Sequence, residues 1–210
     1  DNGPSKVLEY TLSTPYNIST ASLVDSFTVS EDGNPFKVRF NNDGSKMFIA
    51  GRELREVIEY SLSTNFDVSS ATKTANSIDV SAQVGGKALL GLTFSPDGKI
   101  MIISEQAFGL HQYSLNKSFD LSGGANFIRS ADLETQTANE AQARGITFNQ
   151  NGTRLFMVGS GFNEINQYTL SEGFNISTAS FDGGATAKHF TPPEGNQDGD
   201  PQGIDFSPSG

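Results

Sequence analysis

The sequence predicts an all-β fold built from tandem repeats of four antiparallel strands. The first observation behind this prediction is a strand–turn–strand signature that recurs along the 210 residues. In its clearest copy, Phe94 ends one strand and Asp97-Gly98 makes the tight turn into the next. The Phe that marks each copy recurs at steps of 54, 54 and 58 residues, at Phe40, Phe94, Phe148 and Phe206. A period of this size indicates a repeat architecture.

A second signature lies out of phase with the first. Each copy alternates apolar and polar residues around a Tyr, as in VIEYSLST, and continues into a short connection such as FDVSSA. The alternation predicts a half-buried strand, and the Asp or Asn of the connection is expected to accept hydrogen bonds from backbone N–H groups two or three residues on. The aromatic residue of the connection is expected to lie beneath the sheet. The four Tyr are Tyr10, Tyr60, Tyr113 and Tyr168.

Weaker β stretches fill the remainder of each period, at 22–30, 73–80, 125–131 and 180–190. One period therefore holds four strands, which we name a (ending at the Phe), b (after the Gly turn), c (with the Tyr) and d (the weaker stretch). No segment has a sustained 3.6-residue apolar period, so almost no helix is predicted. Four antiparallel strands in about 40–55 residues are typical of a β-propeller blade. The Gly residues of strand a fit where inner strands crowd the ring axis.

The motifs resemble those of a known repeat family. The pattern PxGIxFSPxG at 201–210 and the sequence FSPDG at 94–98 are similar to the YVTN and lactonase-like β-propeller repeat. The connection LSTxFDxSTA is similar to propeller repeats of marine bacterial and phage-associated surface proteins. The resemblance covers nearly the whole chain. It implies a propeller fold, and its lactonase branch implies lactone hydrolysis.

We expect a single propeller domain over residues 1–210. Residues 1–35 supply strands c and d of an incomplete blade, 36–88, 89–142 and 143–200 form three blades, and 201–210 form the first strand of a further blade. About 3.75 four-stranded blades are thus present. A ring closed from these strands alone leaves open edges on strands a and c, which proteins avoid. We therefore expect a larger ring of six to eight blades, completed by further residues or by a second chain.

The amino-acid composition argues against several classes of partner and site. The net charge is −10 and the Lys and Arg residues are scattered, which argues against a nucleic-acid partner. The chain has no Cys, which excludes disulfides, thiol catalysis and Cys-based zinc sites. No apolar run approaches membrane-spanning length, so no membrane span is predicted. We expect no organic cofactor.

A ligand site is predicted on one face of the ring. The a–b turns and c–d connections are nearly alike in every repeat and should share one face. The b–c and d–a connections vary and should share the other. Variable loops on a rigid scaffold commonly bind ligands, so the site is expected on that second face and at the mouth of the central channel. The candidates are Arg52, Glu53, Arg55, Glu105, Phe108, Arg144, Phe162 and Asn163.

Metal and catalytic candidates are few. The oxygen-rich stretch 196–200 could wrap Ca²⁺ through Asp198 and Asp200, and the alternative interpretation is an acidic turn. His111 is expected at a partly exposed position of strand c, and His189 near the end of strand d. We assign no catalytic residue. The residue before each Tyr is expected to make a scaffold hydrogen bond because it recurs in every blade; these residues are Glu9, Glu59, Gln112 and Gln167.

Two functions are compatible with these patterns. The first is a non-enzymatic module for binding, adhesion or structure, with a protein or glycan ligand, placed outside the cell, on its surface or on a virion. The alternative is a lactonase-like hydrolase with acidic residues and Arg144 or His111 at the channel mouth. The second requires that acids or His from different blades converge on one point of the channel.

Overall fold

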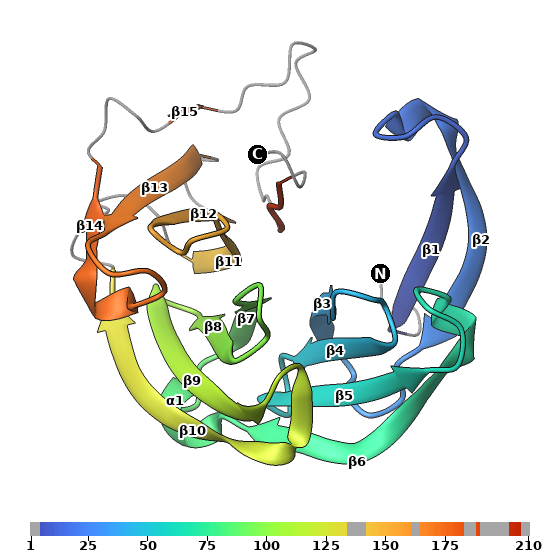
Figure 1. The fold of residues 1–210 in the computed structure, drawn as a ribbon, viewed down its shortest axis with the longest axis horizontal. Coiled ribbons are helices and arrows are strands. Elements are labelled where there is room, and N and C mark those ends of the chain that lie inside the picture. Colours follow the sequence, from blue (N-terminus) through green and yellow to red (C-terminus); the bar gives the residue numbers. More distant parts are fainter. Residues whose placement is uncertain (1–4, 134–141, 161–163, 183–187, 190–201, 207–210) are drawn as a thin grey trace.

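A computed structural model describes residues 5–133, 142–160, 164–182, 188–189 and 202–206. Its antiparallel sheets stand side by side along an arc, and each sheet runs from the inside of the arc to the outside (Figure 1). This arrangement confirms the predicted all-β fold of four-stranded propeller blades.

The first two sheets hold residues 6–79. The first sheet contains β1 (Lys6–Leu12) and β2 (Ala21–Thr28), the predicted strands c and d, joined by the 3₁₀ turn η1 (Ile18–Thr20). The second sheet has the order β3-β4-β5-β6. Its strands are β3 (Pro35–Phe40), β4 (Lys46–Gly51), β5 (Glu56–Leu62) and β6 (Ala71–Asp79), with the 3₁₀ turn η2 (Val68–Ser70) between β5 and β6.

The third and fourth sheets repeat the same order. A one-turn helix, α1 (Ser81–Val84), leads into the third, which contains β7 (Leu89–Phe94), β8 (Ile100–Glu105), β9 (Gly109–Lys117) and β10 (Asp120–Asp132). The fourth contains β11 (Gln142–Phe148), β12 (Arg154–Ser160), β13 (Glu164–Leu170), β14 (Ala179–Phe181) and β15 (Lys188–His189), with η4 (Ile176–Thr178) before β14. Both β14 and β15 pair with β13, so the stretch predicted as one strand at 180–190 is described as two short ones.

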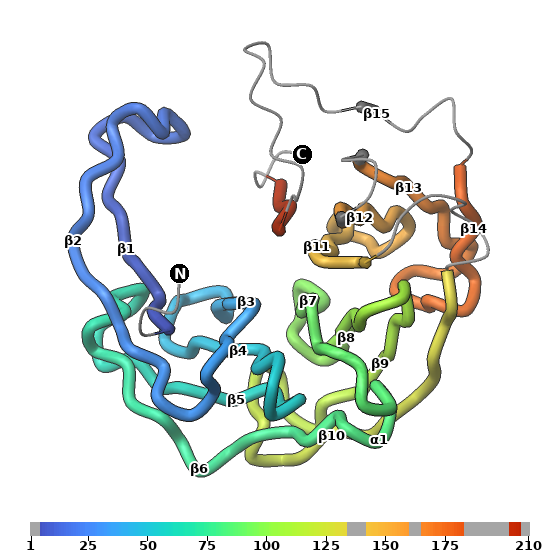
Figure 2. Tube along the Cα trace, turned by 180° about the vertical axis from the view of Figure 1, so that it is seen from behind, coloured from blue at the N-terminus to red at the C-terminus, as the bar shows by residue number. Residues whose placement is uncertain are grey.

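The innermost strands are β3, β7 and β11, and residues 202–206 lie inside the arc beside them (Figure 2). Crowding there explains a glycine of strand a. A Cβ added at Gly145 would lie 2.9 Å from the Cα of Gly203, so a larger residue would force the inner strands apart. The expectation that Gly serves close approach near the axis is confirmed at this position.

The core lies between neighbouring sheets. Between the second and third sheets, for example, Phe48 and Val57 pack with Leu92 and Tyr113. Similar clusters join the first sheet to the second and the third to the fourth. Burial of each large apolar side chain contributes about 1.5–3 kcal/mol, so the packing of sheet on sheet provides most of the stabilisation.

The c–d connections form the predicted Asx turns. In each one, the side chain of the Asp or Asn accepts a hydrogen bond from the backbone N–H two residues on, and a 3₁₀ turn follows in three of the four copies. The aromatic residue of the connection lies on the glycine of the a–b turn. The N–H of Phe119 donates to the carbonyl of Gly98 at 2.9 Å, and Phe66 and Phe174 do the same at Gly44 and Gly152. These contacts confirm that a–b turns and c–d connections share one face.

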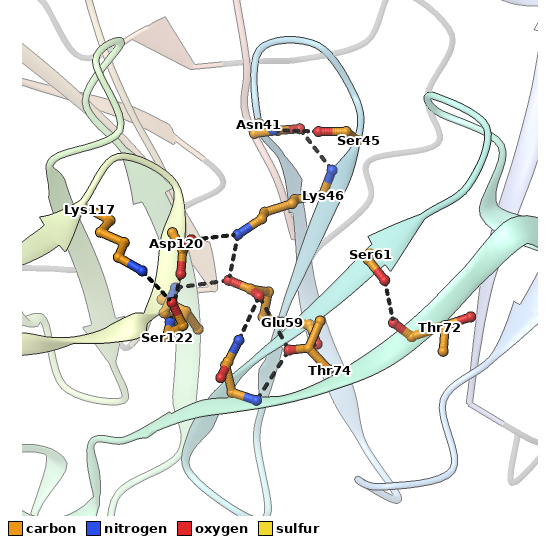
Figure 3. Close-up of polar contacts among 12 residues, drawn as sticks. Asn41, Ser45, Lys46, Glu59, Ser61, Thr72, Thr74, Lys117, Asp120 and Ser122 are labelled. Atoms are coloured by element: carbon orange, nitrogen blue, oxygen red, sulfur yellow. Dashed lines mark hydrogen bonds and ion pairs between the residues drawn. The ribbon is translucent and has the colours of Figure 1, made fainter.

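A buried carboxylate links the second blade to the third (Figure 3). Glu59, 1% exposed, accepts hydrogen bonds from Lys46 Nζ at 3.2 Å and from the backbone N–H of Leu121 at 2.8 Å. Its other oxygen accepts from Thr74 and Asn76 of its own sheet. The corresponding acceptors Glu9 and Gln112 receive the N–H groups of Val68 and Ile176 in the next blade. The predicted scaffold hydrogen bond is therefore confirmed at three junctions between sheets.

Candidate functional site

The inner strands β3, β7 and β11 and the segment 202–206 each place one residue around a common cavity. The residue before the strand-a Phe is Arg39, Thr93, Thr147 or Asp205, and all four line a cavity of about 900 Å³. Arg39 Nη1 lies 3.8 Å from Asp205 Oδ2, and the Thr147 hydroxyl donates to Asp205 Oδ1 at 3.4 Å. Arg39 also donates to the carbonyl of Ile146 at 3.4 Å. Side chains from different blades therefore meet on the inside of the arc.

Two further cations, Lys37 and Arg144, lie near enough to affect each other's charge, although neither lines this cavity. Lys37 lies two residues before Arg39 and so projects to the same side of β3. Burial, together with the charges of Arg39 and Arg144, lowers the pKa of Lys37 to about 8. Burial also lowers the pKa of Arg39, against the opposing effect of Asp205. We call Lys37, Arg39, Arg144 and Asp205 the axial cluster.

Among the described residues, Lys37 adds a cation beside the Arg39–Asp205 ion pair. The side chain of Asp205 is 71% exposed, whereas that of Arg39 is 24% exposed. Partly desolvated cations attract anions more strongly than exposed ones, because less water screens them. The arrangement can hold an anionic group, and its carboxylate can orient or deprotonate a water molecule.

On the predicted variable-loop face, Lys87 connects two of the candidate residues, Arg55 and Glu105. The guanidinium of Arg55 donates to the carbonyls of Gly86 and Lys87 at 2.8 and 3.0 Å. Lys87 Nζ in turn lies 2.7 Å from Glu105 Oε1. Glu105 is 3% exposed, so its carboxylate serves as a buried partner of Lys87. The sequence gives no sign that Lys87 has this role, because a Lys that follows two Gly residues is typical of an exposed turn.

Arg52 and Glu53 lie in a neighbouring loop that a buried acid organises. The carboxylate of Asp32, 1% exposed, accepts the N–H groups of Glu53 and Leu54 at 3.2 and 2.9 Å. The guanidinium of Arg52 lies 5.7 Å from the ring centre of Phe36. These contacts join the d–a connection to the b–c connection, and so confirm that the two share the second face.

The remaining candidates fall elsewhere. Phe108 is 1% exposed and packs in the apolar cluster between the third and fourth sheets, so its side chain offers no surface to a ligand. Arg144 donates to Gln142 at 2.9 Å and belongs to the axial cluster. Phe162, Asn163, Asp198 and Asp200 lie outside the described residues. Within the ranges that are described, no three acidic or His side chains are grouped as metal ligands.

The prediction that His111 is partly exposed was wrong. His111 is 6% exposed, its Nδ1 lies 2.7 Å from the hydroxyl of Ser130, and its Nε2 is buried. Burial and the charge of Lys87 lower its pKa to about 4. The physical reason is that β9 lies in the interior of the third sheet, between β8 and β10, and this sheet packs between two others. A polar side chain on β9 is therefore buried. Because β9 is the third strand from the inside, His111 is not at the channel mouth.

Comparison with solved structures identifies the fold. A proposed 6-phosphogluconolactonase from Bacteroides fragilis NCTC 9343 has a TM-score of 0.55 and 16% identity, over 85% of this chain and 48% of that one. A proposed 6-phosphogluconolactonase from Bacteroides uniformis ATCC 8492 gives 0.54 and 17%, over 90% and 50%. The periplasmic gluconolactonase PpgL of Pseudomonas aeruginosa gives 0.54 and 14%, over 86% and 47%.

These likenesses show the fold alone, which is that of a β-propeller. This chain spans about half the length of each of these three structures. Comparison of the sequence with protein-family models and with curated proteins finds no match. In the part of the chain that the structure describes, no helix is both long and apolar enough to cross a bilayer.

Proposed function

We propose that this chain forms part of a lactonase-like propeller that binds an anionic sugar lactone at its axial cluster and hydrolyses it. The observation that carries the proposal is the ion pair of Arg39 with the carboxylate of Asp205 on the inside of the arc, with Lys37 on the same side of β3 as Arg39. The proposal is also supported by the names of the structural neighbours, two proposed 6-phosphogluconolactonases and a gluconolactonase.

The chemistry of lactone hydrolysis suits these groups. Water attacks the carbonyl carbon, the ring C–O bond breaks, and the product is a hydroxy acid. In the proposed reaction Asp205 accepts the proton of the attacking water, and Arg39 stabilises the negative charge that develops on the carbonyl oxygen. Lys37, with a pKa of about 8, donates a proton to the departing ring oxygen.

The expected substrate carries a phosphate or a carboxylate. Arg39 has Asp205 as a partner, whereas no carboxylate is paired with Lys37 among the described ion pairs. A charged substituent on the sugar would supply the missing negative charge, and charge-assisted hydrogen bonds to such groups are stronger than neutral ones.

A second candidate is a non-enzymatic module that recognises a protein or a glycan outside the cell or on a virion. It is favoured by the single carboxylate of the axial cluster, which is largely exposed and therefore not held in one orientation by packing. This candidate predicts binding at the axis without turnover.

Turnover measurements separate the two candidates. The protein would be assayed by pH-stat titration on gluconolactone and its 6-phosphate, with spontaneous hydrolysis subtracted. We expect Asp205→Asn to abolish turnover but keep product binding. We expect Lys37→Met to slow turnover of both compounds and to weaken binding of the phosphorylated one. Asp43→Asn, an exposed acid on an a–b turn, is the matched control and should change neither. Binding without turnover in the unmodified protein would favour the recognition module.

A further inference from the structure

One strand a carries a Lys where the other copies carry glycine. Counted back from the Phe that ends each strand a, the third residue is glycine in three copies and Lys in one, at Gly91, Gly145, Gly203 and Lys37. The inner segments crowd at these glycines, since a Cβ added at Gly145 would lie 2.9 Å from the Cα of Gly203. The long amine of Lys37 therefore lies at the most crowded level of the inner strands.

The neighbours of this amine are cationic and aromatic. The Nζ of Lys37 lies 3.6 Å from the point that a Cβ of Gly203 would occupy, so the side chain reaches the inner segment 202–206. It also lies 5.3 Å from the ring centre of Phe36. The charges that act on it are those of Arg39 and Arg144. Among the described ion pairs, none joins Lys37 to a carboxylate.

This environment favours the uncharged form of the amine. Burial and the two guanidinium groups lower the pKa of Lys37 to about 8. At pH 8 about half of this amine is unprotonated, against roughly 0.4% of an ordinary Lys with a pKa of about 10.4. A partly desolvated Lys next to other cations is the arrangement that makes a Lys amine nucleophilic. The guanidinium groups keep their charge at this pH and attract an anionic substituent.

From this cluster we infer that Lys37 forms an imine with an aldehyde or ketone that carries a carboxylate or a phosphate. The nitrogen of Lys37 attacks the carbonyl carbon and a C–N bond forms. The carbonyl oxygen then leaves as water with the two N–H protons, which produces a C=N bond. The anionic substituent pairs with Arg39, which lies two residues along on the same side of β3. The step needs no oxidant, no reductant and no lactone, so it goes beyond the proposed hydrolysis.

Reductive trapping measures the imine at each Lys. The whole protein would be incubated at pH 8 with glyoxylate and sodium cyanoborohydride, which reduces the C=N bond to a stable amine, and its peptides would be quantified by mass spectrometry. We expect Lys37 to be modified about tenfold faster than Lys73 and Lys99, which are exposed on β6 and on an a–b turn. Propanal, an aldehyde without a charge, should show a much smaller preference for Lys37.

Two variants and an unfolded control locate the cause. Arg39→Met should slow the reaction of Lys37 with glyoxylate about tenfold. Arg52→Met, whose guanidinium lies over the ring of Phe36, is the matched control and should leave the rate unchanged. In urea all lysines should react alike.

Two results would overturn the inference. One is an equal rate at Lys37 and Lys99 in the folded protein, and the other is an equal preference for Lys37 with propanal and with glyoxylate. Selective trapping at Lys37 in a protein that hydrolyses no lactone would still support the inference. Lactone turnover without selective trapping would overturn this inference alone.

Discussion

The ring of Phe119 covers Gly98 so closely that a Cβ on Gly98 would lie 2.1 Å from the ring carbon Cδ2. Both residues have positive φ, 66° and 47°. This backbone conformation is unfavourable for a bulky residue such as Phe. Contact with the glycine, and with Phe94 at 5.5 Å between ring centres, stabilises Phe119 in that conformation.

Gly98→Ala should therefore destabilise the protein more than its φ alone explains. The left-handed conformation costs an Ala about 1–2 kcal/mol, and the clash with Phe119 adds about 1–3 kcal/mol of overpacking. Gly85→Ala is the matched control, because Gly85 also has a φ of 60° but nothing within 4 Å of an added Cβ. Urea denaturation measures both. Equal losses would show that the ring contact contributes nothing.

Removal of the Glu59 carboxylate should loosen the junction between the second and third blades. Glu59→Ala leaves the N–H of Leu121 and the amide of Asn76 without their acceptor, which costs about 1–3 kcal/mol for each buried donor, while Lys46 keeps Asp120 as a partner. Glu59→Gln should cost only about 1–2 kcal/mol, because Gln112 makes the same link at the next junction. Glu9→Ala, at a half-buried position, is the control with a smaller loss. Urea unfolding midpoints would rank the three variants, and an unchanged midpoint in Glu59→Ala would contradict the role.

Stability should fall with pH below about 6.5 because of His111. Its pKa is about 4 in the folded protein and about 6.5 when unfolded, so the unfolded chain binds the extra proton between these values. The contribution is fully present above pH 6.5 and is lost as the pH falls towards 4, up to about 3 kcal/mol. His111→Asn, which copies Asn166 of the next repeat, should flatten this part of the curve. Urea midpoints from pH 4 to 7.5 test it, and identical slopes for the two proteins would refute it.

The corners of each blade could be predicted from the sequence because their causes are local. Asp97-Gly98 has the turn chemistry of a short hairpin, and Asp67 accepts the N–H of Ser69 within its own turn. Each signature also appears in several copies, which reveals the period and so the architecture. The positive φ of Phe119 was not predicted, because only the packed structure shows the glycine beneath its ring.

Apart from Arg144, the axial cluster could not be predicted, because it depends on contact between inner segments that come from separate blades. Arg39, Thr93, Thr147 and Asp205 occupy one position of the repeat with three residue types, so comparison of the repeats shows only variation. One signal was available in the sequence. The first and last of these copies carry a charged residue, Arg39 or Asp205, where the two central copies carry Thr. The burial of His111 also escaped prediction, because only the packed structure shows how closely its strand is enclosed.

Anion binding at the axial cluster should weaken as the pH rises through about 8. Lys37 has a pKa lowered to about 8 by burial and by Arg39 and Arg144, so it is charged below this pH and neutral above it. Binding of 6-phosphogluconate, followed by isothermal titration calorimetry from pH 6.5 to 9.5, should lose about tenfold in affinity across this range, as expected when one close charge is removed. Lys37→Arg should keep its affinity to pH 9.5, because a guanidinium stays protonated. Lys37→Met should be weak at every pH. Arg55→Lys, in a b–c loop outside the axial cluster, should follow the unmodified protein. A flat profile in the unmodified protein would mean that the anion does not contact Lys37, and would remove the assignment of this residue to the site.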